Sequence, residues 1–521
     1  KENIKVHNLW LEKLKSIIYI DDLKKKYQFK KIPYNITPII GEYDNPKEQK
    51  QGLVTLDFTT KGNTIIYSIN EKNTIVNTLL YSLITTYTSK EVNIYVLDFD
   101  SETLKIYKNC PSVGDVVFVN EKEKVDKLFK LLNQEIEQRK KKFQDYNGSY
   151  EYYISHSSVK LPTIILLISG YENFKETYEE EEIILSKITR DGVKYGLYTI
   201  VTAISDRSIR LSLRANFSQI VPLKLNSAIE YNMVLGKKCP TISETANRGI
   251  IIINDNPFEF QTATICENEK LHDYIKGICD YLKQNENTKA KPIPILPEKV
   301  TISMINNDLK SIESIPIGIE EETLEISTYN FTKNLINLIN AEDVDALTSF
   351  TKLLIKELSI IKTTKIMVID YKNLYQEEMS NVIYINGQNL DINNIFKDIE
   401  ESENKCLIFI NDAEQFIKHI QTKIGNDITS YLTKLFNLKK CYLVFNTDLF
   451  NIKKLAYESW FRQFTSLDNA IWIGKGLNNT TIHNLITPLR ILASPLPPNF
   501  GYNIKNGKAI KIKVLEGDTD E

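Results

Sequence analysis

The chain has 521 residues, of which 42% are hydrophobic and 25% are charged. A single hydrophobic core stops growing at roughly 250 to 300 residues, so this length predicts two domains, and the ordinary composition excludes disorder and a fibrous architecture. Because 65 basic residues oppose 67 acidic ones, giving a net charge of -2, there is no general positive field to attract DNA, and we expect no nucleic-acid partner.

Six cysteines and five histidines are scattered along the chain, and no two cysteines form a CxxC pair. This distribution argues against a disulfide framework and against a metal site, and it favours a reducing cytosol. The longest apolar runs, such as residues 163–168, are strand-sized and well short of a membrane helix. The chain begins with Lys1 rather than Met and carries no signal peptide, which indicates a piece of a longer protein.

Residues 1–36 predict an arm that joins the first domain to whatever precedes it, with an apolar segment at residues 7–11. The first domain is predicted at residues 37–289, where short apolar runs alternate with longer amphipathic stretches such as 75–86. That alternation is typical of a parallel sheet covered by helices on both faces. The predicted strands of this sheet are residues 63–67, 93–98, 162–168 and 197–203.

Residues 290–300 contain three prolines, which remove backbone donors and hold the chain extended, so we predict a linker there. The same alternation recurs in a second domain at residues 301–521, with a helix at 347–358. Each domain ends in a predicted hairpin, and the second carries the Asn506-Gly507 pair that favours a tight primed turn. The matching segments are strands at 334–339, 365–370, 406–410 and 441–446, and hairpins at 249–262 and 501–514.

In the first domain, the turn between a strand and a helix lies where a phosphate-binding loop of the form GxxxxGK[ST] would lie, but it contains no glycine. Lys72 and Thr74 imitate the phosphate lysine and the magnesium hydroxyl of that loop. The alternative, which we favour, is that Asn73 or Thr74 caps the helix and that Lys72 is solvated. The residues of this vestigial Walker A motif are Asn70, Glu71, Lys72, Asn73 and Thr74.

In the second domain the equivalent turn is acidic, with Glu342, Asp343 and Asp345 where a phosphate would lie. Carboxylates at the start of a helix satisfy the same amides and the same dipole as a bound anion. We therefore expect the protein to fill this position with its own side chains and to repel a triphosphate.

The Walker B positions are degenerate as well. A strand that ends in adjacent acids normally supplies a magnesium ligand and a residue that activates water. The first domain has Ser169 and Gly170 at these positions, whereas the second has the neutral Asn411 followed by Asp412. We therefore assign no catalytic residue with certainty.

Two further sets of polar residues follow predicted strands. Asp98 and Asp370 end matching strands, where a carboxylate more often caps a turn than performs chemistry. Arg207, Arg210 and Arg214 are candidates for an arginine finger, but with no phosphate to stabilise we expect them in interface salt bridges.

Several segments together resemble the second and third FtsK/SpoIIIE-type ATPase domains of the EssC/EccC family of type VII secretion proteins, in the EssC-like form. Each motif is weak alone, but their order and spacing extend over essentially the whole chain. The segments that carry the resemblance are residues 7–11, 38–58, 95–99, 195–203, 293–300 and 470–476.

The resemblance implies two tandem RecA-like modules of the additional-strand P-loop NTPase type, with parallel or mixed sheets. It implies a full-length protein that is anchored in the membrane, assembles as a hexamer with other type VII secretion components, and has a first, active ATPase domain upstream. It also implies that the terminal domain docks WXG100-type (Esx) substrates in a groove near its vestigial nucleotide site. Our candidates for that groove are Leu347, Phe350 and Leu354, although their helical spacing also fits an ordinary core stripe.

We therefore expect a cytoplasmic C-terminal part of the secretion motor, located at the cytoplasmic face of the membrane. Its degenerate modules, weakly active or inactive as ATPases, recognise substrates and regulate the upstream motor domain. The alternative is an ATP-hydrolysing motor module that drives protein export, with ATP and magnesium at the first module. A DNA translocase is disfavoured by the neutral charge.

Overall fold

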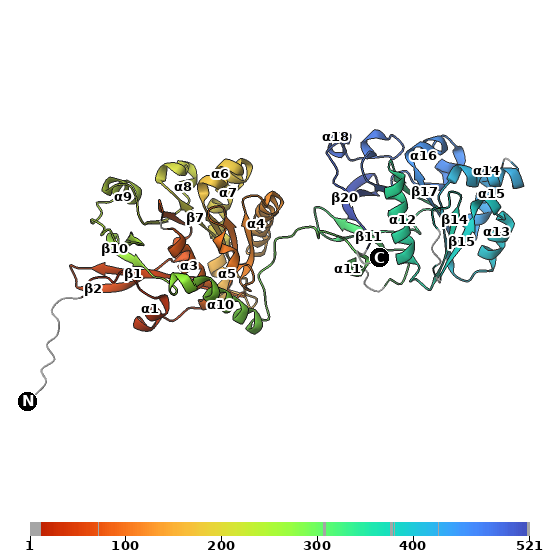
Figure 1. Cartoon of the computed structure of the whole chain (residues 1–521). Helices are drawn as coiled ribbons and strands as arrows, with labels where there is room; N and C mark the ends of the chain where they lie inside the picture. Colours follow the sequence, from red (N-terminus) through yellow and green to blue (C-terminus); the bar gives the residue numbers. More distant parts are fainter. Residues whose placement is uncertain are drawn as a thin grey trace, which may run out of the picture. The chain divides into compact units, whose positions relative to one another are not determined.

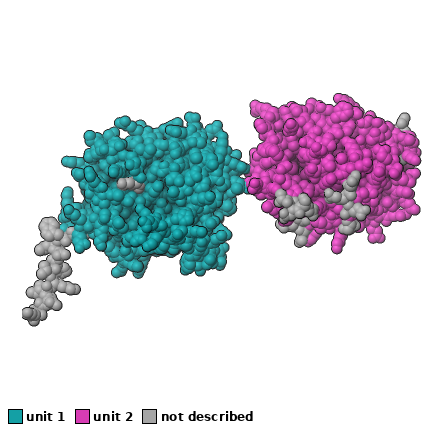
Figure 2. Space-filling model, in the orientation of Figure 1, with its two compact units in different colours: residues 1–295 teal, residues 296–521 magenta. Residues whose placement is uncertain are grey.

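The computed structural model describes residues 12–70, 72–305, 309–375, 379, 381–425 and 427–517. The chain divides into two compact units, residues 1–295 and 296–521 (Figure 2), and each has its own strands and helices (Figure 1). The division falls inside the predicted linker at 290–300, which contains no helix or strand. The apolar segment 7–11 and Glu71 lie outside the described residues.

Unit 1 is built on six parallel strands in the order β5-β4-β6-β7-β3-β8. Strands β4, β6 and β7 are buried along their whole length, as their continuous apolar runs predict for strands that are covered on both faces. The four predicted strands are confirmed, and β5 and β8 were not predicted. The bounds are β3 (Thr64–Tyr67), β4 (Val92–Asp98), β5 (Val113–Phe118), β6 (Thr163–Ser169), β7 (Leu197–Ala203) and β8 (Gln219–Pro222).

Helices cover both faces of this sheet. Residues of α3 and α10 belong to one hydrophobic core, and residues of α4 and α7 belong to the core on the other face. The helices of unit 1 are α1 (Ile20–Lys26), α2 (Phe58–Lys61), α3 (Lys72–Thr86), α4 (Lys122–Lys142), α5 (Tyr150–His156), α6 (Tyr171–Thr177), α7 (Glu179–Asp191), α8 (Leu211–Arg214), α9 (Ala228–Leu235) and α10 (Leu271–Asn285), with short 3-10 turns at Thr103–Tyr107, Gly192–Tyr195, Asp206–Ser208 and Asn268–Lys270.

A second, antiparallel sheet in unit 1 has the order β2-β1-β10-β9. Its strands are β1 (Ile39–Asn45), β2 (Lys50–Thr55), β9 (Arg248–Ile253) and β10 (Asn256–Thr262), and the last two form the predicted hairpin. The described part of the predicted arm also packs here, because Ile20 and Leu23 are buried in the core and the Arg248 guanidinium donates to the carbonyl of Leu14 at 2.7 Å. The chain therefore joins the fold of unit 1 before the predicted boundary at residue 36.

Unit 2 contains a single ten-stranded sheet in the order β12-β11-β20-β19-β18-β13-β17-β16-β14-β15. The last six strands of that order are parallel, and the antiparallel β18–β19 pair joins them to the other four. The bounds are β11 (Ile315–Glu320), β12 (Ile326–Tyr329), β13 (Ile336–Ala341), β14 (Thr364–Asp370), β15 (Val382–Asn386), β16 (Lys405–Ile410), β17 (Cys441–Asp448), β18 (Ala470–Ile473), β19 (Phe500–Lys505) and β20 (Lys508–Val514).

One face of this sheet is covered by α12, and the other by α13, α14 and α15. The predicted hairpin at 501–514 is confirmed, and Asn506 and Gly507 have the positive φ angles of +49° and +77° that a primed turn needs. The helices are α11 (Ile302–Ile305), α12 (Val344–Leu358), α13 (Ile392–Glu401), α14 (Ala413–Ile424), α15 (Ile428–Asn437), α16 (Leu449–Leu455), α17 (Ser459–Phe464) and α18 (Leu489–Leu492), with 3-10 turns at Gly387–Asn389 and Leu477–Asn479.

The strand orders confirm the predicted internal repeat. The order 5-4-6-7-3-8 of unit 1 matches 15-14-16-17-13-18 of unit 2, and the order 2-1-10-9 matches 12-11-20-19. The units differ where these two parts meet, because β18 pairs with β19 but β8 does not pair with β9. β8 ends at Pro222, which has no backbone N–H to donate to a neighbouring strand. The predicted fold class, tandem α/β modules with parallel and mixed sheets, is confirmed.

Candidate functional site: the turns after β3 and β13

In unit 1 the phosphate position lies between β3 and α3, at the carboxyl edge of the parallel sheet. Helix α3 begins at Lys72, so Asn73 and Thr74 lie within its first turn and are not the capping residue. The side chain of Lys72 is buried, and its Nζ lies 3.2 Å from Oδ1 of Asp100. The prediction that Lys72 is solvated is therefore wrong, because the loop after β4 covers it. Asn70 is exposed.

The Walker B position of unit 1 has no room for an acid. Gly170 has a φ of +85°, and a Cβ atom there would lie 3.0 Å from the backbone of Phe99 and 3.2 Å from Cβ of Asp100. Its N–H donates to Oγ1 of Thr202 at 2.9 Å, and the carbonyl of Ser169 accepts from the N–H of Phe99 at 2.9 Å. The loop that carries Asp100 therefore occupies the space in which a Walker B side chain would lie.

The strand-terminal aspartates hold turns, as predicted. The Asp98 carboxylate is buried and accepts from the N–H of Leu104 at 2.9 Å. The Asp370 carboxylate accepts from the N–H groups of Lys372 at 3.0 Å and Tyr375 at 2.8 Å. Both carboxylates therefore cap the loop that follows their strand.

Two of the three arginines after β7 form ion pairs inside unit 1. The Arg214 guanidinium lies 2.8 Å from Asp206, and that of Arg210 lies 3.1 Å from Glu182. Arg207 is exposed, and no ion pair joins it to another described residue. These two salt bridges are therefore formed within unit 1. From the sequence, we expected salt bridges at an interface.

In unit 2 the start of α12 is capped by an aspartate. Oδ1 of Asp343 accepts from the N–H groups of Asp345 at 2.9 Å and Ala346 at 3.2 Å. The Glu342 carboxylate accepts from Nδ2 of Asn479 at 3.1 Å. Val344 is the first residue of α12, as Lys72 is of α3, so this position offers no cation to a phosphate. The carboxylate of the protein thus satisfies amides that an anion would otherwise bind.

The Walker B residues of unit 2 are also bonded within the fold. Asn411 is buried, its Nδ2 donates to the Asp370 carboxylate, and its Oδ1 accepts from the N–H of Tyr371 at 2.9 Å. Asp412 caps α14 by accepting from the N–H of Gln415 at 3.0 Å. These groups build the edge of the sheet and the start of α14, which accounts for their polarity.

The docking candidates on α12 are core residues. Leu347, Phe350 and Leu354 are 4%, 2% and 0% exposed, and they pack against the sheet. The prediction that they line an open groove is wrong, because the helix turns this apolar stripe toward β13 and β17. The alternative, a core stripe, is confirmed.

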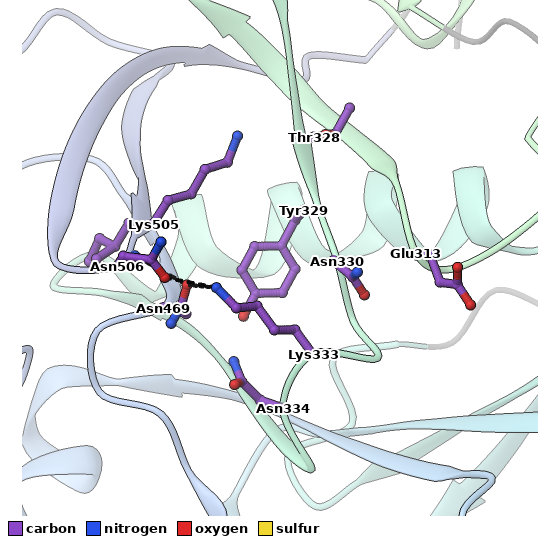
Figure 3. Close-up of a pocket in the computed structure, with 10 residues that line it drawn as sticks. Glu313, Thr328, Tyr329, Asn330, Lys333, Asn334, Asn469, Lys505 and Asn506 are labelled. Atoms are coloured by element: carbon purple, nitrogen blue, oxygen red, sulfur yellow. Dashed lines mark hydrogen bonds between the residues drawn. The ribbon is translucent and has the colours of Figure 1, made fainter.

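A polar pocket of about 250 Å³ lies elsewhere in unit 2, beside the segment that precedes β13 (Figure 3). Nζ of Lys333 donates to Oδ1 of Asn469 at 3.0 Å and to Oδ1 of Asn506 at 2.9 Å, and Figure 3 shows these three side chains meeting at the hairpin turn. The lysine therefore ties the β19–β20 turn to the sheet, and none of the residues that line the pocket is a predicted site residue.

The two turns lack the glycines of a GxxxxGK[ST] loop, which cradles a triphosphate with magnesium. Within the described ranges, no three His, Cys, Asp or Glu side chains lie close enough to hold a metal ion. Lys72 is already paired with a carboxylate, and α12 begins with carboxylates rather than with glycines and a lysine. Among the helices of the described residues, none has the length and apolarity that a bilayer crossing requires.

One charged group at these positions was not predicted. Asp100 follows Asp98 by two residues, and at the same place after Asp370 unit 2 carries Lys372, a residue of opposite charge. Comparison of the loops after the two matching strands would have revealed this reversal in the sequence.

The fold and the two turns define a class of protein: tandem RecA-like modules in which a strand, a turn and a helix meet at the carboxyl edge of a parallel sheet. Residues 63–238 match the model of the FtsK/SpoIIIE family, so unit 1 contains an FtsK/SpoIIIE domain. The chain is 23% identical over 442 residues to the type VII secretion system protein EssC of Staphylococcus aureus (strain MRSA252). The aligned region covers 78% of this chain and 29% of that protein.

Two solved structures have the same fold. One contains ATPases 2 and 3 of EssC from Geobacillus thermodenitrificans, with a TM-score of 0.80, 19% identity, and coverage of 98% of this chain and all of that one. The other contains ATPases 2 and 3 of Thermomonospora curvata EccC in complex with a signal sequence peptide, with a TM-score of 0.56, 16% identity and coverage of 98% and 100%. The predicted resemblance to EssC/EccC type VII secretion proteins is confirmed.

Proposed function

We propose that this chain is the cytoplasmic C-terminal part of a membrane-anchored, EssC-like type VII secretion motor. Its two degenerate modules recognise WXG100-type (Esx) substrates and regulate an upstream motor domain, within a hexamer that contains other type VII secretion components. Nucleic acid is not a partner. One observation carries the proposal: the polar groups at both nucleotide positions are engaged by the chain itself, through the Lys72–Asp100 pair and the Asp343 cap.

Substrate recognition is supported by how unit 1 binds an extended segment of its own chain. The N–H of Ala290 donates to the carbonyl of Pro111 at 2.7 Å, and the hydroxyl of Tyr95 donates to the carbonyl of Lys291 at 2.7 Å. Ile293 is 4% exposed and belongs to the core that contains α4. The edge formed by β4, β5 and α4 thus holds a segment of the chain that is neither helix nor strand, which supports a role of this edge in binding peptides.

The repeat relates that edge to β14, β15 and α13 of unit 2, which becomes our candidate docking surface in place of the α12 stripe. β15 is the terminal strand of its sheet, and no described strand pairs with its outer side. Its apolar residues are only partly covered, and Ile383 is 40% exposed. An edge strand with accessible backbone groups and apolar side chains suits an extended peptide, and the Thermomonospora curvata relative was solved with a signal sequence peptide.

Calorimetric titration of the whole chain tests this function. We expect no saturable binding of magnesium ATP and no hydrolysis, because both nucleotide positions are filled by the chain's own groups. We expect a peptide from the C-terminus of a WXG100-type protein to bind. Tight ATP binding with turnover, or failure of every such peptide to bind, would count against the proposal.

The docking surface makes a separate prediction. Ile383→Asp places a charge on the exposed side of β15, and we expect the affinity for the WXG100 peptide to fall roughly tenfold or more. The matched control is Ile486→Asp, which changes a side chain that is 79% exposed elsewhere in unit 2, and it should leave the affinity unchanged. Equal losses in both variants would remove β15 from the docking surface.

The alternative function is an ATP-hydrolysing motor module that drives protein export. The FtsK/SpoIIIE domain and the lysine at the first residue of α3 favour it. In that case the isolated chain hydrolyses ATP, with magnesium at the first module, and Lys72→Ala abolishes the hydrolysis. A chain with no measurable turnover before this substitution eliminates the alternative.

A further inference from the structure

Unit 1 keeps one cation at its phosphate position, and the chain neutralises it. Lys72 is 8% exposed, and its Nζ lies 3.2 Å from Oδ1 of Asp100. Asp100 comes from the loop after β4, a different element from the helix that carries the lysine. A buried ammonium needs an anionic partner, because removal from water is costly for an unpaired charge. Asp100 supplies that partner from within the protein.

The place that Asp100 takes is made available by the degeneration of the Walker B position. A Cβ atom at residue 170 would lie 3.2 Å from Cβ of Asp100, so the present position of the aspartate loop leaves little room for a Walker B acid. Unit 2 has the converse arrangement: Asp412 follows Asn411, Lys372 replaces Asp100, and Val344 begins the helix. Unit 1 therefore has both Lys72 and Asp100, whereas unit 2 has no lysine at the position that matches Lys72 and no aspartate at the position that matches Asp100.

We propose that Asp100 is a built-in anion that occupies the phosphate position of unit 1 and keeps polyphosphate ligands away from Lys72. This inference rests on the proposed function, in which neither module turns over ATP, and it identifies the residue that holds unit 1 in that state. Both a carboxylate and a phosphate bind an ammonium through charge-assisted hydrogen bonds, so they compete for the same donor. Without the Asp100 charge, the ammonium group of Lys72 remains, beside the exposed residues Asn70 and Asn73, to attract an external anion.

The test is Asp100→Asn in the whole chain, titrated by calorimetry with magnesium ATP and, separately, with tripolyphosphate. We expect the variant to bind both at least tenfold more tightly than the unchanged chain. Lys72→Ala in the same variant should abolish the gain. Glu102→Gln removes a nearby exposed carboxylate and should change nothing. Asp100→Ser repeats the test without the amide, and the partly exposed side chain of Asp100 favours folding of both variants.

The outcomes separate the two proposals. If the unchanged chain binds and hydrolyses ATP, the proposed function fails. If it does not, and folded Asp100→Asn and Asp100→Ser chains also bind neither ligand, the built-in anion is refuted while the proposed function stands. A gain that persists after Lys72→Ala also refutes the inference, because the ligand would then be bound elsewhere.

Discussion

Replacing Glu357 with glutamine is expected to raise the free energy of unfolding of unit 2 by about 4 kcal/mol at about pH 8, and by far less at about pH 5. Glu357 lies near the end of α12 with 0% exposure, and neither carboxylate oxygen has a hydrogen-bond partner among the described residues. Burial alone raises the pKa of this carboxyl from 4.5 to about 8.

The direction of the effect follows from the two pKa values. Between about pH 4.5 and about pH 8, the folded chain keeps a proton on Glu357 that the unfolded chain has released. The contribution of this group to stability is fully present below pH 4.5 and is lost as the pH rises through 8, at about 1.4 kcal/mol per pKa unit. Glutamine has the shape of the protonated acid and cannot ionise, so it removes this dependence.

Urea unfolding followed by tryptophan fluorescence measures this prediction. Two of the three tryptophans, Trp460 and Trp472, are buried in unit 2, so the signal reports chiefly on that unit. Glu458→Gln is the matched control, because Glu458 is exposed and its neutralisation should change stability by about 0.5 kcal/mol or less. An equal gain from Glu357→Gln at both pH values would show that the protonation of Glu357 does not differ between the folded and the unfolded chain, and would contradict the prediction.

The fold was largely predictable because its signals are local. Short continuous apolar runs such as 163–168 favour buried strands, and the primed turn at Asn506-Gly507 is defined by two adjacent residues. Strands at the sheet edges were missed, including β15, because its apolar run of residues 382–385 is too short to distinguish a strand from a loop. The order of the strands was not predicted, because it depends on pairing between segments that are distant in sequence.

The site was less predictable, since it depends on which segments meet in space. Periodicity defined the stripe of Leu347, Phe350 and Leu354 but could not decide whether it faced the sheet or a groove. The partner of Lys72 comes from a loop 28 residues further along the chain, and no local pattern indicates that Asp100 folds back onto it. The Asp343 cap, by contrast, was predictable because a capping side chain and its helix are adjacent in sequence.

Acid should destabilise unit 2 through His483. The pH dependence of this group is opposite to that of Glu357, because burial lowers the pKa of the histidine and raises that of the glutamate. The imidazole is 5% exposed, packs edge-on against Trp472 at 6.0 Å between ring centroids, and within the described part of the chain neither ring nitrogen has a hydrogen-bond partner. Burial lowers the pKa of His483 from 6.5 to about 4, so protonation favours the unfolded chain. The stability that this group contributes is fully present above pH 6.5 and is lost as the pH falls toward 4, a loss of about 3 kcal/mol.

His483→Leu replaces the ring with an apolar side chain that cannot be protonated. Between neutral pH and about pH 4, the free energy of unfolding should therefore fall by about 3 kcal/mol less in the variant than in the unchanged chain. Trp472 touches the ring and reports on it directly in urea unfolding at each pH. His272→Leu, which changes a side chain that is 68% exposed, should leave the acid dependence as it is. Parallel acid profiles for the unchanged chain and the His483 variant would mean that the folded chain accommodates the imidazolium, contrary to its buried and unbonded position. Glu357 and His483 together place the greatest stability of unit 2 at mildly acidic pH. Ionisation of Glu357 destabilises the folded chain above that range, and protonation of His483 destabilises it below that range.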